Sequence, residues 1–214
     1  MIIFLKIHPI IAEKFMQKSQ QQETSWESRY QAKTTGWDRG KTSGNLLAWI
    51  ENKDLKPCRI LVPGCGNGYE VLTLAEKGFD VTAVDIAPTP IANLQKALDD
   101  NKLSAELIES NFFSLDYSDN GFDAIYEQTC LCALPPSEWS NFEQWLHNSL
   151  KTGGKLYAQF MQTHAEGGPP FHCDMTEMKQ LFSDKRWDWN KETDAQTMSA
   201  LKDKSEIPCL LVKV

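Results

Sequence analysis

The chain has 214 residues, of which 41% are hydrophobic and 24% are charged. That composition is ordinary for a folded globular protein and excludes wholesale disorder. The 22 Lys and Arg residues against 29 Asp and Glu residues give a net charge of −7. This balance argues against a nucleic-acid partner, because phosphate binding begins with a basic surface. No apolar run reaches the roughly 20 residues that a bilayer demands, so we expect no membrane association.

The first residues, 1–11, are largely apolar. They lack the basic start, the longer apolar centre and the small-residue cleavage site of a secretory signal. Residues 17–23 are polar, as in a solvated linker. We interpret residues 1–22 as an N-terminal extension and residues 23–214 as one domain.

From residue 58 onward, short apolar runs alternate with longer amphipathic segments. The apolar runs predict strands at 58–62, 79–84, 106–108, 122–126, 155–161, 186–190 and 207–214. The amphipathic segments predict helices at 69–77, 88–100, 137–150 and 174–182. This alternation predicts a doubly wound α/β fold with a mostly parallel, seven-stranded sheet. The last two strands follow each other without a helix, which predicts an antiparallel edge strand.

The turn after the first predicted strand carries Gly64, Gly66 and Gly68. Glycine permits a tight turn and lets a ligand lie against the backbone. Asp85 follows about 20 residues on, at the end of the next strand, where a carboxylate can accept hydrogen bonds from both hydroxyls of a ribose. Tyr69 stands where a dinucleotide-binding turn has its third glycine. The spacing favours a ligand with a nucleoside but no pyrophosphate, and S-adenosylmethionine meets that description.

Six cysteines are scattered along the chain without any C-x-x-C spacing. The single C-x-C pair, Cys130 and Cys132, lacks a second pair at zinc-like spacing, so we expect no metal site. A chain of this length has core enough to fold without disulfides. We therefore predict reduced, mostly buried thiols and a cytoplasmic protein.

Four sequence blocks stand in order along the chain. They are Trp26-Glu-Ser-Arg-Tyr30 with Gly36-Trp37-Asp38-Arg39-Gly40, then Leu61-Val62-Pro63-Gly64-Cys65-Gly66-Asn67-Gly68, then Phe122-Asp123-Ala124-Ile125-Tyr126-Glu127 with Cys132-Ala133-Leu134-Pro135-Pro136, and Gly167-Gly168-Pro169-Pro170-Phe171. In these blocks the chain resembles the thiopurine S-methyltransferase superfamily, most closely its halide/thiol methyltransferase branch. The resemblance implies a class I, Rossmann-like methyltransferase domain that uses S-adenosylmethionine. The expected acceptor is a small soft nucleophile: a thiol, a thiopurine-like heterocycle, a halide or a related chalcogen anion.

The candidate cofactor ligands lie in the N-terminal block, in the turn and at predicted strand ends. They are Trp26, Tyr30, Trp37, Gly64, Cys65, Gly66, Gly68, Asp85, Ile86, Asn111, Phe112 and Glu127. The resemblance implies that the aromatic residues of the first block cover the cofactor, and aromatic faces attract a cation such as a sulfonium. An amide at Asn111 can meet the adenine amine, and Glu127 can pair with the α-ammonium group. A core role for the aromatic residues and a rim position for Glu127 are the alternatives.

For the acceptor pocket we select Leu131, Cys132, Phe160, Phe171 and His172, with His164 as the candidate catalytic residue. His164 could accept the thiol proton, or it could only hydrogen-bond a backbone carbonyl. These residues predict an apolar pocket without the basic side chains that a carboxylate-bearing acceptor would want. We expect a small-molecule acceptor as the partner and a monomer or weak dimer in solution.

Some positions depart from the family pattern. Many methyltransferases have an acidic residue where this chain has Val62, and relatives often have Asp where this chain has Asn111. Phe160 and Met161 stand where an aromatic hydroxyl is expected. Two alternative functions therefore stay open: a cofactor-binding protein without catalysis, and a nicotinamide-dependent oxidoreductase, which Tyr69 disfavours.

Overall fold

The computed structural model describes residues 25–189, 198–199 and 203–214. The predicted extension at 1–22 lies outside the described residues, as does residue 190 of a predicted strand. Among the described residues, no helix combines the length and the apolar character needed to cross a membrane.

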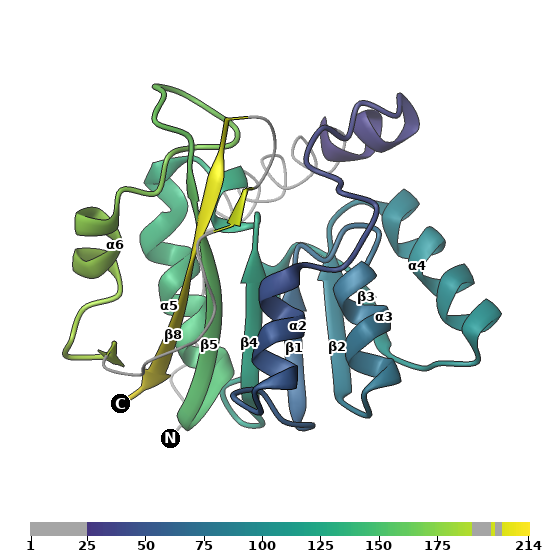
Figure 1. Ribbon diagram of the computed structural model, residues 1–214, viewed down its shortest axis with the longest axis horizontal. Coiled ribbons are helices and arrows are strands. Elements are labelled where there is room, and N and C mark those ends of the chain that lie inside the picture. Colours follow the sequence, from purple (N-terminus) through teal and green to yellow (C-terminus); the bar gives the residue numbers. More distant parts are fainter. Residues whose placement is uncertain (1–24, 190–197, 200–202) are drawn as a thin grey trace, which may run out of the picture.

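One twisted sheet forms the centre of the domain (Figure 1). Its strands are β1 Arg59–Pro63, β2 Asp80–Asp85, β3 Glu106–Glu109, β4 Phe122–Gln128, β5 Leu150–Gln162, β6 Trp187–Asp188, β7 Met198–Ser199 and β8 Ser205–Lys213. The strand order is β3-β2-β1-β4-β5-β8-β6, and the two-residue strand β7 pairs with β8. β8 runs antiparallel to β5 and β6, whereas the pairs from β3 to β5 are parallel. The predicted doubly wound, mostly parallel sheet with an antiparallel strand near one edge is confirmed. The antiparallel strand β8 lies between β5 and the two-residue edge strand β6, and the two-residue strand β7 is an eighth strand beside the seven that were predicted.

Helices cover both faces of this sheet (Figure 1). They are α2 Gly44–Glu51, α3 Tyr69–Glu76, α4 Pro88–Asn101, α5 Trp139–Ser149 and α6 Met175–Leu181, and residues 25–31 form a further helix. Alternate residues of a strand point to opposite faces. In β1, Ile60 and Val62 therefore join the core under α2, α3 and α4, while Leu61 joins the core under α5 and α6.

The sequence did not predict α2, which begins at Gly44. Eight residues make little more than two helical turns, and such a short helix depends on packing rather than on propensity. Leu46 and Trp49 supply that packing, since both side chains are fully buried.

Helix α5 and strand β5 meet differently from the prediction. The helix was predicted to end at residue 150 and the strand to begin at residue 155, but the helix ends at Ser149 and β5 begins at Leu150, so Gly153 and Gly154 lie inside the strand. A Cβ atom at Gly154 would lie 2.8 Å from the Lys151 carbonyl oxygen. The pairing of β4 with β5 also shifts register between Phe122 and Ala124. This glycine therefore permits a close backbone approach at an irregular stretch of the sheet.

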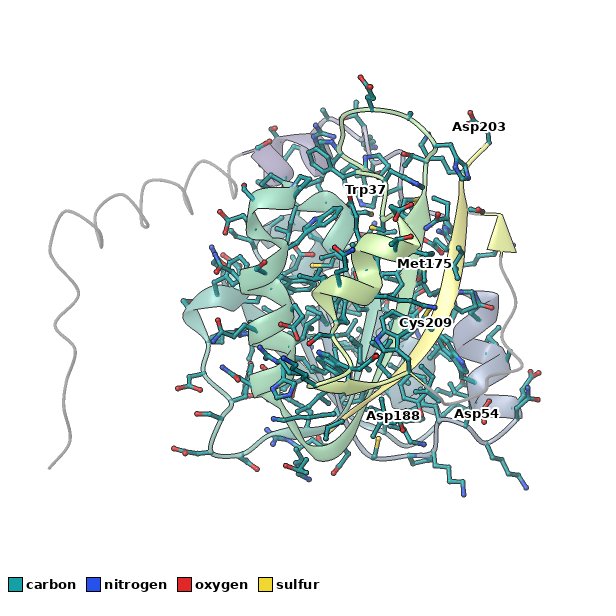
Figure 2. The ribbon with its side chains drawn as sticks, turned by 90° about the vertical axis from the view of Figure 1, so that its left-hand side faces the viewer. Trp37, Asp54, Met175, Asp188, Asp203 and Cys209 are labelled. Atoms are coloured by element: carbon teal, nitrogen blue, oxygen red, sulfur yellow. The ribbon has the colours of Figure 1, made fainter. Side chains whose placement is uncertain are left out.

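The ends of the strands define where a ligand can bind. Figure 2 shows Trp37 and Asp203 at one end of the molecule and Asp54 and Asp188 at the other. Because β8 is antiparallel, its first residues lie at the same end as the C-terminal ends of the parallel strands, which is where open α/β sheets bind ligands.

Candidate active site

A cavity of about 500 Å³ opens at the C-terminal ends of the parallel strands. All the predicted cofactor ligands except Glu127 line it: Trp26, Tyr30, Trp37, Gly64, Cys65, Gly66, Gly68, Asp85, Ile86, Asn111 and Phe112. These residues come from the N-terminal segment and from the ends of β1, β2 and β3. The fold therefore brings together groups that are far apart in the sequence.

The glycine turn between β1 and α3 has a left-handed backbone at Gly66 and Gly68, with φ of 52° and 72°. A Cβ atom on Gly66 would lie 2.9 Å from the Tyr30 hydroxyl oxygen, and one on Gly68 would lie 2.5 Å from the Leu94 methyl groups. Gly66 thus faces the cavity wall formed by Tyr30, and Gly68 faces the core beneath α4. Only glycine combines this backbone conformation with so little space.

Asp85 ends β2 beside this turn. One carboxylate oxygen accepts a hydrogen bond from the Gly66 amide at 2.8 Å, and the other accepts one from the Ala87 amide at 2.9 Å. The residue is 8% exposed. Burial raises the pKa of its carboxyl group, and the backbone hydrogen bonds oppose that rise. A carboxylate has about four acceptor positions, so Asp85 can order the turn and also accept hydrogen bonds from ligand hydroxyls.

Three aromatic rings form a cluster over the cavity. The Trp26 and Trp37 ring centroids lie 5.2 Å apart, and those of Tyr30 and Trp37 lie 5.7 Å apart, both edge to face. The Arg29 guanidinium lies 5.2 Å from the Trp26 ring centroid. This cluster is anchored to the domain by Glu27, whose carboxylate accepts hydrogen bonds from the amide and the hydroxyl of Thr89 on α4. The rings therefore form a fixed aromatic cover.

Asn111 and Phe112 follow β3, at the far side of the cavity from β5. The Asn111 side chain accepts a hydrogen bond from the Phe113 amide at 3.0 Å and so begins the short helix η1 Phe112–Ser114. The Phe112 ring packs against Phe142 and Trp145, each at a centroid distance of 5.1 Å. Both residues line the cavity, and the hydrogen bond of Asn111 and the ring contacts of Phe112 fix their side chains there.

Glu127 is outside the cavity lining. One of its carboxylate oxygens accepts hydrogen bonds from the amides of Cys130, at 3.1 Å, and Leu131, at 2.9 Å. The residue is 2% exposed, and burial raises the pKa of its carboxyl group to about 7. This carboxylate holds the turn that follows β4. The residues that β4 and this turn present to the cavity are Gln128, Thr129 and Cys130.

Of the predicted acceptor residues, Cys132 lines the cavity, and Leu131, Phe160, Phe171, His172 and His164 do not. Phe160 packs in the core against Phe182, at a centroid distance of 5.5 Å. The next residue along β5, Met161, lines the cavity instead, as the alternation of side chains in a strand requires.

The loop after β5 also differs from the expectation. His164 is exposed, and the His172 ring nitrogen Nδ1 accepts a hydrogen bond from the Thr163 amide at 3.1 Å. The cavity is lined instead by Pro169 and Pro170 of this loop. His164 therefore has no place on the wall that an acceptor would contact.

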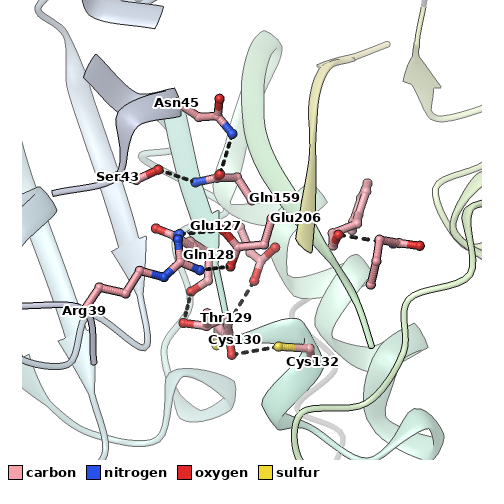
Figure 3. A network of polar contacts seen from close by, with 12 residues as sticks. Arg39, Ser43, Asn45, Glu127, Gln128, Thr129, Cys130, Cys132, Gln159 and Glu206 are labelled. Atoms are coloured by element: carbon pink, nitrogen blue, oxygen red, sulfur yellow. Dashed lines mark hydrogen bonds and ion pairs between the residues drawn. The ribbon is translucent and has the colours of Figure 1, made fainter. Parts of the chain in front are cut away.

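The cavity as a whole carries basic side chains, which the prediction of an apolar acceptor pocket did not include. Arg29, Arg39, Lys41 and Lys204 all line it. They come from the N-terminal segment and from the approach to β8, two parts of the chain that sequence spacing could not place together. Arg39 makes a direct ion pair with the buried Glu206 of β8, and this pair belongs to a network of polar side chains (Figure 3).

All six cysteines are free, as predicted. Cys65, Cys130 and Cys132 line the cavity, and burial raises the pKa of each thiol well above its usual value. These thiols are therefore neutral, apolar parts of the wall at neutral pH. Within the described ranges, no group of three or more His, Cys, Asp or Glu side chains could hold a metal ion.

The fold is that of class I methyltransferases that use S-adenosylmethionine. Among solved structures, a Burkholderia thailandensis 1,6-didemethyltoxoflavin-N1-methyltransferase with bound S-adenosylhomocysteine aligns with a TM-score of 0.69 and 16% identity, over 93% of this chain and 90% of that one. The magnesium protoporphyrin IX methyltransferase of Synechocystis PCC 6803, with S-adenosylmethionine bound, aligns with a TM-score of 0.70 and 13% identity, over 92% and 97%. At these identities the likeness shows the fold.

The family follows from the sequence. The model of the thiopurine S-methyltransferase family matches residues 21–210, and the chain belongs to that family. The Arabidopsis thaliana protein named "Probable thiol methyltransferase 2" is 30% identical over 167 residues, which cover 77% of this chain and 74% of that protein. A thiopurine S-methyltransferase of Psychrobacter cryohalolentis is 26% identical over 183 residues, covering 74% and 83%. The resemblance seen in the four sequence blocks is confirmed.

Proposed function

We propose that this methyltransferase transfers the methyl group of S-adenosylmethionine to the soft atom of a small acceptor. The acceptor class comprises thiols, thiopurine-like heterocycles, halides and related chalcogen anions. The observation that carries this proposal is the placement of the glycine turn, Asp85 and the aromatic cover around one cavity, in a chain of the thiopurine S-methyltransferase family.

The described residues fit a charged sulfur nucleoside. Gly66 brings its backbone to the cavity wall without a side chain, and a Cβ atom there would press on the Tyr30 hydroxyl at 2.9 Å. Asp85 would hold the ribose, and Asn111 and Phe112 would hold the adenine. Trp26, Tyr30 and Trp37 would cover the sulfonium and exclude water, so that the cationic centre meets aromatic faces.

When bound, S-adenosylmethionine supplies a methyl group on a sulfonium that is already activated for displacement. The chain then contributes mainly position, which can lower a barrier by about 7–11 kcal/mol in favourable cases. A thiol must become a thiolate, and its reference pKa is about 8.5. A few per cent is thus ionised at neutral pH, and halides need no base. The proposal therefore does not depend on His164, which lies outside the cavity lining.

The acceptor end of the cavity is the part nearest β5. Its apolar wall consists of Cys132, Ala133, Leu134, Met161, Pro169 and Pro170. The sulfur of a thiol is compatible with such a wall because it hydrogen-bonds water only weakly, so its transfer from water costs little. We further propose that the protein is cytoplasmic, where thiols stay reduced, and acts on small molecules as a monomer or weak dimer.

The test combines binding and turnover. Calorimetry with S-adenosylhomocysteine should show one site per chain, and Asp85→Ala should weaken that binding. Methyl transfer is then measured with labelled S-adenosylmethionine against thiols, thiopurines, iodide and selenite. Affinity without transfer to any acceptor of this panel would identify a binding protein, and saturable binding of NAD in place of S-adenosylhomocysteine would overturn the proposal.

A further inference from the structure

A buried ion pair stands at the acceptor end of the cavity. The Arg39 Nη2 atom lies 2.5 Å from a carboxylate oxygen of Glu206. The Glu206 side chain is 0% exposed and that of Arg39 is 16% exposed. Arg39 also lines the cavity. A guanidinium has five N–H donors in a planar fork, so an arginine held along one edge can present its other donors to a ligand.

Glu206 fixes a second side chain at the same place. Its other carboxylate oxygen accepts a hydrogen bond from Gln128 Nε2 at 2.8 Å, and the Tyr126 hydroxyl donates to Gln128 Oε1 at 2.7 Å. Gln159 in turn donates to the Tyr126 hydroxyl at 2.7 Å. Figure 3 shows Arg39 and Gln128 on either side of the Glu206 carboxylate, with Gln159 held by Ser43 and Asn45 nearby. Each polar group therefore has a defined orientation before any ligand binds.

The position of the pair assigns it to the acceptor end and not to the nucleoside end. The groups that fit the nucleoside stand at the ends of β1, β2 and β3. Glu206 is paired with Met161 across β5 and β8, on the other side of β4. The same region contains the apolar wall formed by Met161, Pro169 and Pro170.

Charge on this part of the wall also differs from the charge of the whole chain. The net charge is −7, yet Lys41 and Lys204 line the cavity together with Arg39. The acidic groups that face Arg39 are Glu206 and Glu70, and the Glu70 carboxylate accepts a hydrogen bond from the Ser43 amide at 2.9 Å. Over its whole lining the cavity carries the four cations Arg29, Arg39, Lys41 and Lys204 against the carboxyl groups of Asp38, Glu70 and Asp85, so the balance there is not acidic as it is for the chain.

We propose that Arg39 recognises a carboxylate on the acceptor, so that the preferred acceptors are small thiols that carry a carboxylate. This inference rests on the proposed methyl transfer and narrows its acceptor class. Arg39 receives the carboxylate through its free edge, the apolar wall contacts the carbon skeleton, and the sulfur is directed toward the methyl donor. Glu206 is a positioning residue, because it acts on the acceptor only through Arg39 and Gln128.

The experiment compares two acceptors of nearly the same shape, 3-mercaptopropionate and its neutral amide, 3-mercaptopropionamide. kcat/KM is measured for both with the wild-type chain, with Arg39→Lys and with Arg39→Gln. The ratio of the two kcat/KM values is compared between variants, which cancels the intrinsic difference in thiol pKa. Lys33→Gln is the control, since Lys33 is an exposed cation of the same segment outside the cavity lining.

We expect Arg39→Gln to lower the preference for the carboxylate about tenfold to a hundredfold, as for the loss of a hydrogen-bonded charge. Arg39→Lys keeps a positive partner for Glu206 but loses the planar fork, and should give an intermediate loss. Affinity for S-adenosylhomocysteine should stay at the wild-type value in both. An equal loss for the two thiols overturns the proposal.

A second outcome would show that Arg39 binds a carboxylate of the cofactor and not one on the acceptor. If Arg39→Gln lowers the affinity for S-adenosylhomocysteine by the same factor as it lowers kcat/KM for 3-mercaptopropionate, the residue holds the cofactor's own carboxylate. The acceptor assignment is then wrong. If the wild-type chain methylates neither thiol but does methylate iodide, the acceptor class is wrong and the methyltransferase assignment stands. If it methylates nothing, the proposed function itself fails.

The positioning role of Glu206 has its own readout. Glu206→Gln keeps the size of the side chain but removes the charge that holds Arg39. It should raise KM for 3-mercaptopropionate several-fold with little change in kcat, and leave KM for the amide unchanged. A fall in kcat for both acceptors with unchanged KM values would contradict a role exercised through Arg39.

Discussion

Two glycines of the β1–α3 turn differ in the direction of the Cβ atom that each one lacks. Gly66→Ala would place its methyl group 2.9 Å from the Tyr30 hydroxyl in the cavity wall. Gly68→Ala would place its methyl group 2.5 Å from the Leu94 methyl groups, and Leu94 is fully buried. Both positions have a left-handed backbone. The pair therefore separates an effect on ligand binding from an effect on folding.

The expected magnitudes follow from these contacts. A left-handed backbone costs an alanine about 1–2 kcal/mol at either position. Overpacking against Leu94 adds about 1–3 kcal/mol for Gly68→Ala. For a chain of this size, 1 kcal/mol corresponds to roughly 2–4 °C in Tm. Gly66→Ala should thus lose roughly 2–8 °C and Gly68→Ala roughly 4–20 °C.

Binding should show the opposite order. Gly66→Ala should weaken the binding of S-adenosylhomocysteine at least tenfold, about 1.4 kcal/mol, because its methyl group would displace Tyr30, part of the aromatic cover that lines the cavity. Gly68→Ala, measured well below its Tm, should lose less affinity. Thermal unfolding by circular dichroism and titration calorimetry provide the two readouts. Wild-type affinity in Gly66→Ala would refute the assignment of the turn to the cofactor.

Three further predictions concern the surrounding residues. Asp85→Ala should weaken the binding of S-adenosylhomocysteine by a far larger factor than it raises the KM for the acceptor. Unchanged affinity in calorimetry would reject the assignment of Asp85 to the ribose. Trp37→Ala removes the ring that contacts both Trp26 and Tyr30, and fluorescence titration should show weaker binding; an unaltered titration curve would assign the ring to the core alone. Burial raises the pKa of Glu127 from 4.5 to about 7, so the folded state binds more protons in that interval. Its contribution to stability is present below pH 4.5 and is lost as the pH rises through 7, by roughly 3 kcal/mol. In Glu127→Gln, the free energy of unfolding measured in urea should depend less on pH between pH 5 and 8. A pH dependence as steep as that of the wild type would point to another group.

The turn and Asp85 could be predicted because their signals are local. A preceding apolar run, the glycine spacing and a carboxylate at the next strand end all lie within residues 58–85. Asp85 indeed ends β2, and its carboxylate contacts the Gly66 amide. The alternation of strands and helices could also be predicted from the sequence, because each element buries its own apolar face and so shows its own hydrophobic periodicity.

The acceptor end could not be predicted in this way. Arg39 and Glu206 are 167 residues apart, and no periodicity relates a loop before α2 to the antiparallel strand β8. The contacts of Glu127 escaped prediction for a different reason. A carboxylate at a strand end has the same sequence signature whether it faces a ligand or holds the following turn, and here it accepts two backbone hydrogen bonds.

The place of β8 within the sheet has a consequence for synthesis. This strand follows all the others in the chain, yet it lies between β5 and β6. During synthesis, β6 therefore lacks its sheet neighbour until residues 205–213 have been added. Glu206, the partner of Arg39, is added with them, whereas the groups proposed to hold the nucleoside all precede β8 in the chain. Under the proposed function, the last strand thus completes the acceptor end of a cavity whose donor end is encoded earlier.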